Sequence, residues 1–254
     1  MFVPGAVHRL ALLAALCVMA FAAAAGELQV GPILVEFAGA TTTQVLRVEN
    51  PGTQPLRAQV RVMAWSQEDG ADRLRPTRDL AASPPVMELA AGQRQLVRII
   101  RLRREDPRQE ESYRLLVDEL PPEAAPGHAG VQLLLRYSIP AFVLPAGSAP
   151  ALERRGRTDA SPRSAEVRPD GERIALAVRN GGDRRVRLSQ LVFEAANGTQ
   201  AELAPGLLGY VLAGQQMQWT LPLPTKQLAA GGVFKVRLND DNERQALPAA
   251  VLAR

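Results

Sequence analysis

Cysteine, histidine and lysine are nearly absent from this sequence. The only cysteine, Cys17, lies in an apolar N-terminal run, so a chain that loses this run has neither thiol nor disulfide. A domain without disulfides must be stabilised by its hydrophobic core alone. Beyond residue 25 the only histidine is His128, in a Pro-Gly-His-Ala-Gly segment.

This scarcity argues against an enzyme and against a metal site. A serine triad needs a histidine oriented by a carboxylate, and His128 is the sole candidate. Zinc sites need clustered cysteine, histidine or acidic ligands, which the sequence does not supply. The acidic run at residues 240–243 lacks the glycine and the spacing of a calcium loop. We therefore expect no catalysis, no metal and no cofactor.

The first 25 residues have the features of a secretory signal. Arg9 supplies a positive charge, residues 10–25 are almost wholly apolar, and Ala23 and Ala25 fit the small-residue rule for cleavage. The run is short for a spanning helix, which favours cleavage after Ala25 over a retained membrane anchor. We expect export and no membrane insertion after cleavage. Residues 26–254 are long enough for two domains.

The net charge of +4 comes almost entirely from arginine, since Lys226 and Lys235 are the only lysines. Basic and acidic residues are interleaved, as in Arg103-Arg104-Glu105-Asp106. Mixed charge of this kind is typical of a solvated surface, so we expect no nucleic-acid partner.

Short runs of alternating apolar and polar residues predict strands throughout the chain. Turn signals such as Asn50-Pro-Gly and Asn180-Gly-Gly separate the runs, which cover residues 45–49, 59–63, 96–102, 113–117, 131–143, 173–179, 186–193, 210–212, 217–221 and 233–238. Pro140 interrupts the longest run and predicts an edge or a bulge there. The pattern predicts an all-β fold of two immunoglobulin-like β-sandwich domains in tandem. The small-residue stretch 144–150 divides a domain at 26–146 from one at 147–254.

An ordered series of motifs runs through the first half of the chain. It comprises Asn50-Pro-Gly, Gln59-Val-Arg-Val, Trp65-Ser-Gln, Leu74-Arg-Pro-Thr, Ser83-Pro-Pro, Gly92-Gln-Arg-Gln, Val97-Arg, Tyr113-Arg and Glu119-Leu-Pro-Pro. In this order the motifs resemble periplasmic pilus chaperones of the chaperone–usher pathway, particularly the archaic branch that serves spore-coat-U-like subunits. The resemblance covers roughly residues 28–145; the second half is similar mainly in length and strand pattern.

The resemblance implies a boomerang-shaped pair of immunoglobulin-like domains and a non-enzymatic role in the periplasm. Members of this family bind pilus subunits that lack a final strand, and they pass these subunits to an outer-membrane usher. An incomplete subunit has an open groove and an unpaired edge that would otherwise aggregate. The chaperone lends the missing strand, with backbone bonds giving affinity and alternate side chains filling the groove. No ATP is implied.

In this family the lent strand is the last strand of the first domain, which here begins at Val131. One face of that run carries the apolar residues expected to enter the groove: Val131, Leu133, Leu135 and Tyr137. The alternative is that these side chains fill the chaperone's own core, because a strand of any sandwich has this pattern.

The resemblance also implies a clamp for the carboxylate at the end of the pilus subunit. Better-known members use an arginine in the first strand and a lysine in the last, where this sequence has Leu34 and Pro140. Arg98 and Arg136 are the predicted replacements, because arginine suits a bidentate contact with a carboxylate. An alternative for Arg98 is an ion pair between the domains, with Glu110 or Glu111 as its partner.

Two other kinds of protein have to be weighed. A secreted immunoglobulin-like pilus subunit or adhesin predicts a detachable N-terminal extension and often a cysteine pair, which this sequence does not show. A hydrolase built on a sandwich scaffold is disfavoured by the shortage of histidine.

Overall fold

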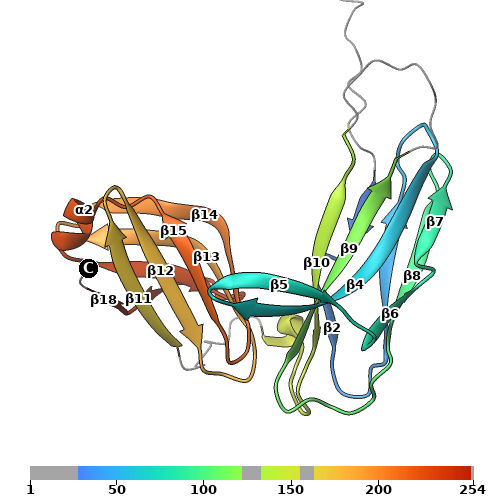
Figure 1. Ribbon diagram of the computed structural model, residues 1–254, viewed down its shortest axis with the longest axis horizontal. Helices are drawn as coiled ribbons and strands as arrows, with labels where there is room; N and C mark the ends of the chain where they lie inside the picture. The colour runs from blue at the N-terminus through green and yellow to red at the C-terminus, as the bar shows by residue number, and fades with distance from the viewer. Residues whose placement is uncertain (1–27, 122–132, 155–162, 253–254) are drawn as a thin grey trace, which may run out of the picture.

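The computed structural model describes residues 28–121, 133–154 and 163–252 and folds them into two β-sandwiches set at an angle (Figure 1). The all-β architecture of two sandwiches expected from the sequence is confirmed. The predicted signal, His128 and Val131 lie outside the described residues.

The N-terminal sandwich consists of two sheets. The first has the strand order β1-β3-β8-β6 and the second β2-β10-β9-β4-β5, with β7 also paired to β4. The strands are β1 (Gln29–Gly31), β2 (Val35–Phe37), β3 (Thr43–Glu49), β4 (Leu56–Glu68), β5 (Ala71–Pro76), β6 (Leu80–Ser83), β7 (Val86–Leu89), β8 (Arg94–Arg101), β9 (Glu111–Leu120) and β10 (Arg136–Val143).

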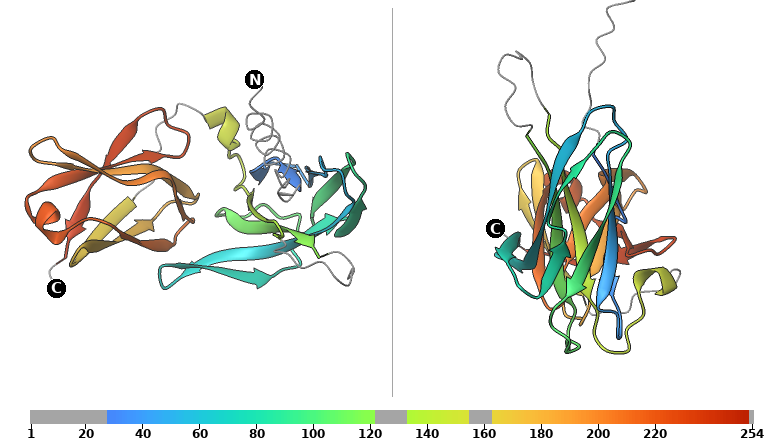
Figure 2. Two further views of the ribbon diagram at one scale, coloured as in Figure 1. Left: turned by 90° about the horizontal axis from the view of Figure 1, so that it is seen from above. Right: turned by 90° about the vertical axis from the view of Figure 1, so that its right-hand side faces the viewer.

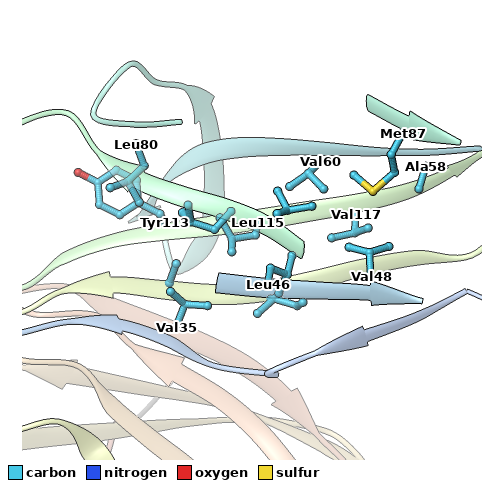
Figure 3. Close-up of a cluster of buried hydrophobic side chains, with 14 of the residues drawn as sticks. Val35, Leu46, Val48, Ala58, Val60, Leu80, Met87, Tyr113, Leu115 and Val117 are labelled. Atoms are coloured by element: carbon cyan, nitrogen blue, oxygen red, sulfur yellow. The ribbon is translucent and has the colours of Figure 1, made fainter. Parts of the chain in front are cut away.

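Alternation along these strands places apolar side chains between the two sheets. Figure 3 shows Leu46 and Leu80 from one sheet packed against Val60, Leu115 and neighbouring residues from the other. These side chains are all but excluded from solvent, so the sandwich has the continuous apolar interior that a disulfide-free domain requires.

The first segment of the chain crosses from one sheet to the other. β1 pairs antiparallel with β3, whereas β2 pairs in parallel with β10, and a cis bond between Gly31 and Pro32 lies at the crossover. β2 covers only Ala141–Val143 of β10. This short pairing leaves the rest of the last strand uncovered.

The C-terminal sandwich has two four-stranded sheets, ordered β15-β12-β11-β18 and β14-β13-β16-β17. It follows a short 3-10 turn, η1 (Ala151–Arg154), and includes one brief helix, α2 (Thr225–Ala229). Its strands are β11 (Arg163–Asp170), β12 (Arg173–Asn180), β13 (Val186–Ala195), β14 (Gln200–Val211), β15 (Gln216–Leu221), β16 (Gly232–Leu238), β17 (Arg244–Leu247) and β18 (Ala249–Val251).

A fully buried asparagine closes the same turn in each domain. The side-chain amide of Asn50 donates to the carbonyls of Gln54, Leu89 and Ala90, and its Oδ1 accepts the N–H of Gly52. Asn180 repeats the arrangement: it donates to the carbonyls of Arg184, Val211 and Leu212, and it accepts from Gly182. Each asparagine side chain therefore satisfies buried backbone carbonyls where a strand ends.

The run predicted at residues 131–143 is shorter in the structure. The strand begins only at Arg136, the described residues 133–135 lie outside it, and the longest described strand is β4. The regular pairing with β9 begins where Arg136 faces Asp118, and this pairing sets the start of the strand.

The two sandwiches contact each other directly. Seen from above in Figure 2, they lie at the two ends of the molecule, and in Figure 1 the β4–β5 hairpin reaches from the first to the second. Gln67 on this hairpin donates to the carbonyl of Tyr210 (2.8 Å) and accepts the N–H of Leu212 (3.0 Å). At the hairpin turn, the carbonyl of Gly70 accepts the N–H of Gln218 at 3.0 Å.

Candidate strand-donation edge and interdomain site

β10 presents an open backbone edge over part of its length. On one side it pairs with β9 from Arg136 to Val143; on the other side β2 pairs only with Ala141–Val143. Within the described residues, no strand lies beside Arg136–Pro140 on that second side. Figure 1 shows this strand on the side of the N-terminal sandwich that faces the second domain.

The direction of the free backbone groups follows from two hydrogen bonds. Glu119 donates its N–H to the carbonyl of Leu135. The odd-numbered residues of β10 therefore direct their backbone N–H and C=O groups toward β9. Leu144 donates to the carbonyl of Phe37, so even-numbered residues direct theirs toward the open side. Arg136 and Ser138 therefore point backbone groups outward. Pro140 lacks an N–H, and the missing donor faces the side where no strand requires it.

The described members of the predicted donor set differ in exposure. Leu133 is 69% exposed, and its neighbour Leu134, which is not in the predicted set, is 42% exposed. Leu135 and Tyr137 are partly buried against the core of the N-terminal sandwich, and the Tyr137 hydroxyl donates to the carbonyl of Leu28 at 2.6 Å. Leu133 therefore has the most surface to offer a partner, whereas Leu135 and Tyr137 also stabilise the N-terminal sandwich itself.

The predicted clamp residues lie on different sheets. Arg98 is on β8, between buried Val97 and Ile99, so its side chain points outward from the first sheet. Arg136 is on the outer face of the second sheet, where its Nε donates to Asp118. The structure does not bring these two arginines together at one site.

The alternative ion pair for Arg98 is wrong. Glu110 pairs with Arg185 and lies near Arg184, and Glu111 pairs with Arg103 at 3.3 Å. The sequence shows that Glu110 and Glu111 are acidic, but it does not show their partners: Arg185 lies in the second domain and Arg103 in a loop after β8.

A buried ion network joins the domains. Arg185 donates to Glu110 at 2.6 Å and also to Glu36, and its guanidinium lies 3.6 Å from the centre of the Phe142 ring. These three charged side chains are each less than 10% exposed. Burial raises the pKa of Glu110, while Arg185 and Arg184 act in the opposite direction. The charges are mutually dependent because each would be costly to bury alone.

Arg114 is a basic residue at the domain interface that sequence reasoning did not select. Its guanidinium stacks 3.7 Å from the centre of the Trp65 ring and lies 5.8 Å from the Tyr210 ring. Among the described residues it makes no ion pair, and burial lowers its pKa. It lies directly opposite Pro140, and its Nη1 is 3.4 Å from the carbonyl of Ser138 on the open edge. The register between β9 and β10 is the signal that identifies it.

Leu34 is the second position at which this chain lacks the basic residue of better-known members, and it too has basic neighbours. It lines a small pocket between the domains together with Arg185, Arg187 and Tyr210. Arg187 is already held by Asp240 at 2.8 Å. The cationic groups of this region therefore come from β9, from β13 and from Arg185 just before β13, not from the first and last strands of the N-terminal domain.

The described part of the chain was also searched for metal ligands and for membrane spans. It contains no group of three or more histidine, cysteine or acidic side chains arranged to hold a metal ion. None of its helices has the length and hydropathy needed to cross a bilayer.

Solved chaperone structures share this fold. A chain of the CsuC–CsuE chaperone–tip subunit pre-assembly complex, from archaic chaperone–usher Csu pili of Acinetobacter baumannii, is 22% identical with a TM-score of 0.68, and the match covers 89% of this chain and 99% of that one. The E. coli chaperone DraB is 23% identical, with a TM-score of 0.56 and coverage of 89% and 96%. A chain from the Salmonella enterica SafA pilin–SafB chaperone complex is 20% identical, with a TM-score of 0.57 and coverage of 88% and 95%. No curated protein sequence matches the chain.

The fold is therefore that of chaperones of the chaperone–usher type. Residues 27–149 match the family described as the pili and flagellar-assembly chaperone, PapD N-terminal domain. This match covers the N-terminal sandwich, which is therefore a domain of the PapD N-terminal type.

Proposed function

We propose that this chaperone binds a pilus subunit in the periplasm by donor-strand complementation and delivers it to an outer-membrane usher. The observation that carries the proposal is the open edge of β10 at Arg136–Pro140, flanked by exposed Leu133. An unpaired edge of this kind accepts a further strand through main-chain hydrogen bonds. Each aliphatic side chain buried in a partner's groove contributes about 1.5–3 kcal/mol before association costs.

The proposal is tested by co-expressing the chain with candidate pilus subunits in the periplasm and isolating complexes through a tag on the chaperone. We expect a one-to-one complex, and levels of the pilus protein that fall when the chaperone is omitted. Levels that do not depend on this chain, with no complex recovered, would rule the proposal out. An adhesin or pilus subunit would then be the better interpretation, although the family match does not favour it.

We further propose that Arg114 receives the terminal carboxylate of the bound pilus protein, in place of the basic pair missing at Leu34 and Pro140. Its guanidinium makes no ion pair within the described residues, is oriented by the Trp65 ring and reaches the open edge of β10. A preoriented, partly desolvated guanidinium suits bidentate contact with a carboxylate.

Replacing Arg114 by methionine should weaken binding of a peptide that copies the C-terminal strand of a pilin by about ten- to a hundredfold, because a charge-assisted hydrogen bond is lost. Titration calorimetry with the free-acid and amidated peptides provides the measurement. Wild type should prefer the free acid, and Arg114→Met should bind both forms equally. The exposed Arg73→Met on β5 removes the same charge and serves as control. A preference for the free acid that survives in Arg114→Met excludes this role.

Arg98 suits contact with the usher better than contact with the pilus protein. It lies on the exposed outer face of the first sheet, opposite Ser83 and Val45, and beside Leu96, which is 54% exposed. Arg98→Ala should leave the complex between chaperone and pilin intact but reduce its binding to the usher by about tenfold. Pull-down of the pilin and binding of the purified complex to an immobilised usher domain separate the two roles. Loss of pilin binding would restore Arg98 as a clamp residue.

A further inference from the structure

One carboxylate, Asp118, ties the beginning of β10 to two neighbouring strands. It lies directly opposite Arg136, whose Nε donates to Oδ1. Its other oxygen accepts from Arg61 on β4, at 2.7 Å from Nη2 and 3.1 Å from Nε. The Asp118 side chain is only 10% exposed, whereas those of Arg61 and Arg136 are 40% and 66% exposed. The carboxylate therefore bridges three adjacent strands on the outer face of the sheet.

Two further contacts hold the same segment. Glu119 accepts the N–H of Leu135 through its carboxylate at 3.2 Å, and donates its own N–H to the Leu135 carbonyl at 2.9 Å. The Tyr137 hydroxyl bonds to Leu28. Residues 135–137 are thus fastened on the β9 side and toward the core, while their open side is left without a partner strand among the described residues.

This fastening matters because a strand paired on one side loses its extended form easily. Fraying lowers the fraction of molecules ready to accept another strand, and the apparent affinity falls by the same factor. Desolvation would raise the pKa of Asp118, but hydrogen bonds from Arg136 and Arg61 outweigh it and keep the pKa low. The bridge therefore stays charged at neutral pH.

We propose that Asp118 is a positioning residue that holds residues 135–138 extended, so that a pilus protein meets a preformed edge. The proposal rests on strand donation as the function. Arg136 then acts through Asp118 and makes no contact with the terminal carboxylate of the bound protein. Asp118 has this role because its two oxygens serve two arginines on opposite sides of β9.

The experiment compares wild type, Asp118→Asn, Arg136→Gln and the double variant. In the free protein, the backbone amides of Leu135, Tyr137 and Ile139, which point toward β9, should exchange with deuterium about tenfold faster in each variant, since a charge-assisted contact is lost. The association rate constant for a peptide copying the C-terminal strand of a pilin should fall about five- to tenfold. The double variant should be no worse than either single variant, because both remove the same interaction.

Glu49→Gln is the matched control, because it breaks a cross-strand pair with Arg94 on the other sheet. It should change neither measurement. Unchanged exchange and association in Asp118→Asn would overturn the proposal. Faster dissociation in Arg136→Gln alone would also overturn it, and would indicate direct contact with the bound pilin. If wild type binds no pilin, strand donation fails, while the exchange measurement still decides whether Asp118 holds the strand.

Discussion

Leu133→Asp should abolish stable capture of a pilus subunit while the chaperone remains folded. Leu133 is 69% exposed, so the substitution removes little from the chaperone's own core. In the complex, an aspartate would have to enter an apolar groove, where a charge without a partner is strongly disfavoured. We expect a loss of affinity on the order of 100-fold, measured by co-purification and by titration with the purified pilin.

Leu207→Asp provides the control for this experiment. Leu207 lies on β14 of the second domain and is 59% exposed, so the substitution has the same chemistry on a comparable surface. It should bind pilin with wild-type affinity. Leu135→Asp is a poorer test because Leu135 packs against the core and its loss would perturb folding. Wild-type capture by Leu133→Asp would contradict donation through this face.

Arg185→Ala should destabilise the chain by about 3–5 kcal/mol and loosen the contact between the domains. The substitution leaves Glu110 and Glu36 buried with their main cationic partner removed, which is the costly way to break a buried pair. Chemical denaturation measures the stability. In a Trp219→Phe background, the fluorescence of Trp65, which makes an edge-to-face contact with Tyr210 across the interface, reports domain separation.

Two variants test this interpretation. Arg75→Ala breaks an exposed pair with Glu68 and should change stability by less than about 1 kcal/mol. Combining Arg185→Met with Glu36→Gln and Glu110→Gln should recover much of the loss, because no uncompensated charge remains. If Arg185→Ala unfolds at the wild-type denaturant concentration, the network contributes little to stability and the remaining contacts between the domains hold them together.

Local alternation of apolar and polar residues predicted most of the strands of the fold. Runs such as residues 45–49 and 59–63 lie within β3 and β4, because alternation reports directly which side chains face the core. The sequence does not predict β5, since Ala71–Pro76 is almost wholly exposed and has no apolar face to reveal it. Its place is set by pairing with β4 and not by burial.

The site was less predictable for a related reason. Open edges and ion networks depend on which strands lie side by side, and sequence spacing does not show this. The exposure of Leu133 agrees with a donor role, but the pairing of Arg136 with Asp118 and the stacking of Arg114 on Trp65 both depend on register. The donor and clamp assignments themselves stay predictions until binding is measured.

The buried turn asparagines also bear on how the protein ages. Asparagine followed by glycine loses its side-chain amide readily when the backbone is free to rearrange, and Asn180 precedes Gly181. Here the amide nitrogen serves three carbonyls, and a carboxylate at this position would place oxygen against oxygen. Asn197, which also precedes a glycine, is exposed and lacks this protection. Chemical damage at Asn180 must therefore wait for the turn to open, so the rate of local unfolding sets how long this turn of the second domain stays intact.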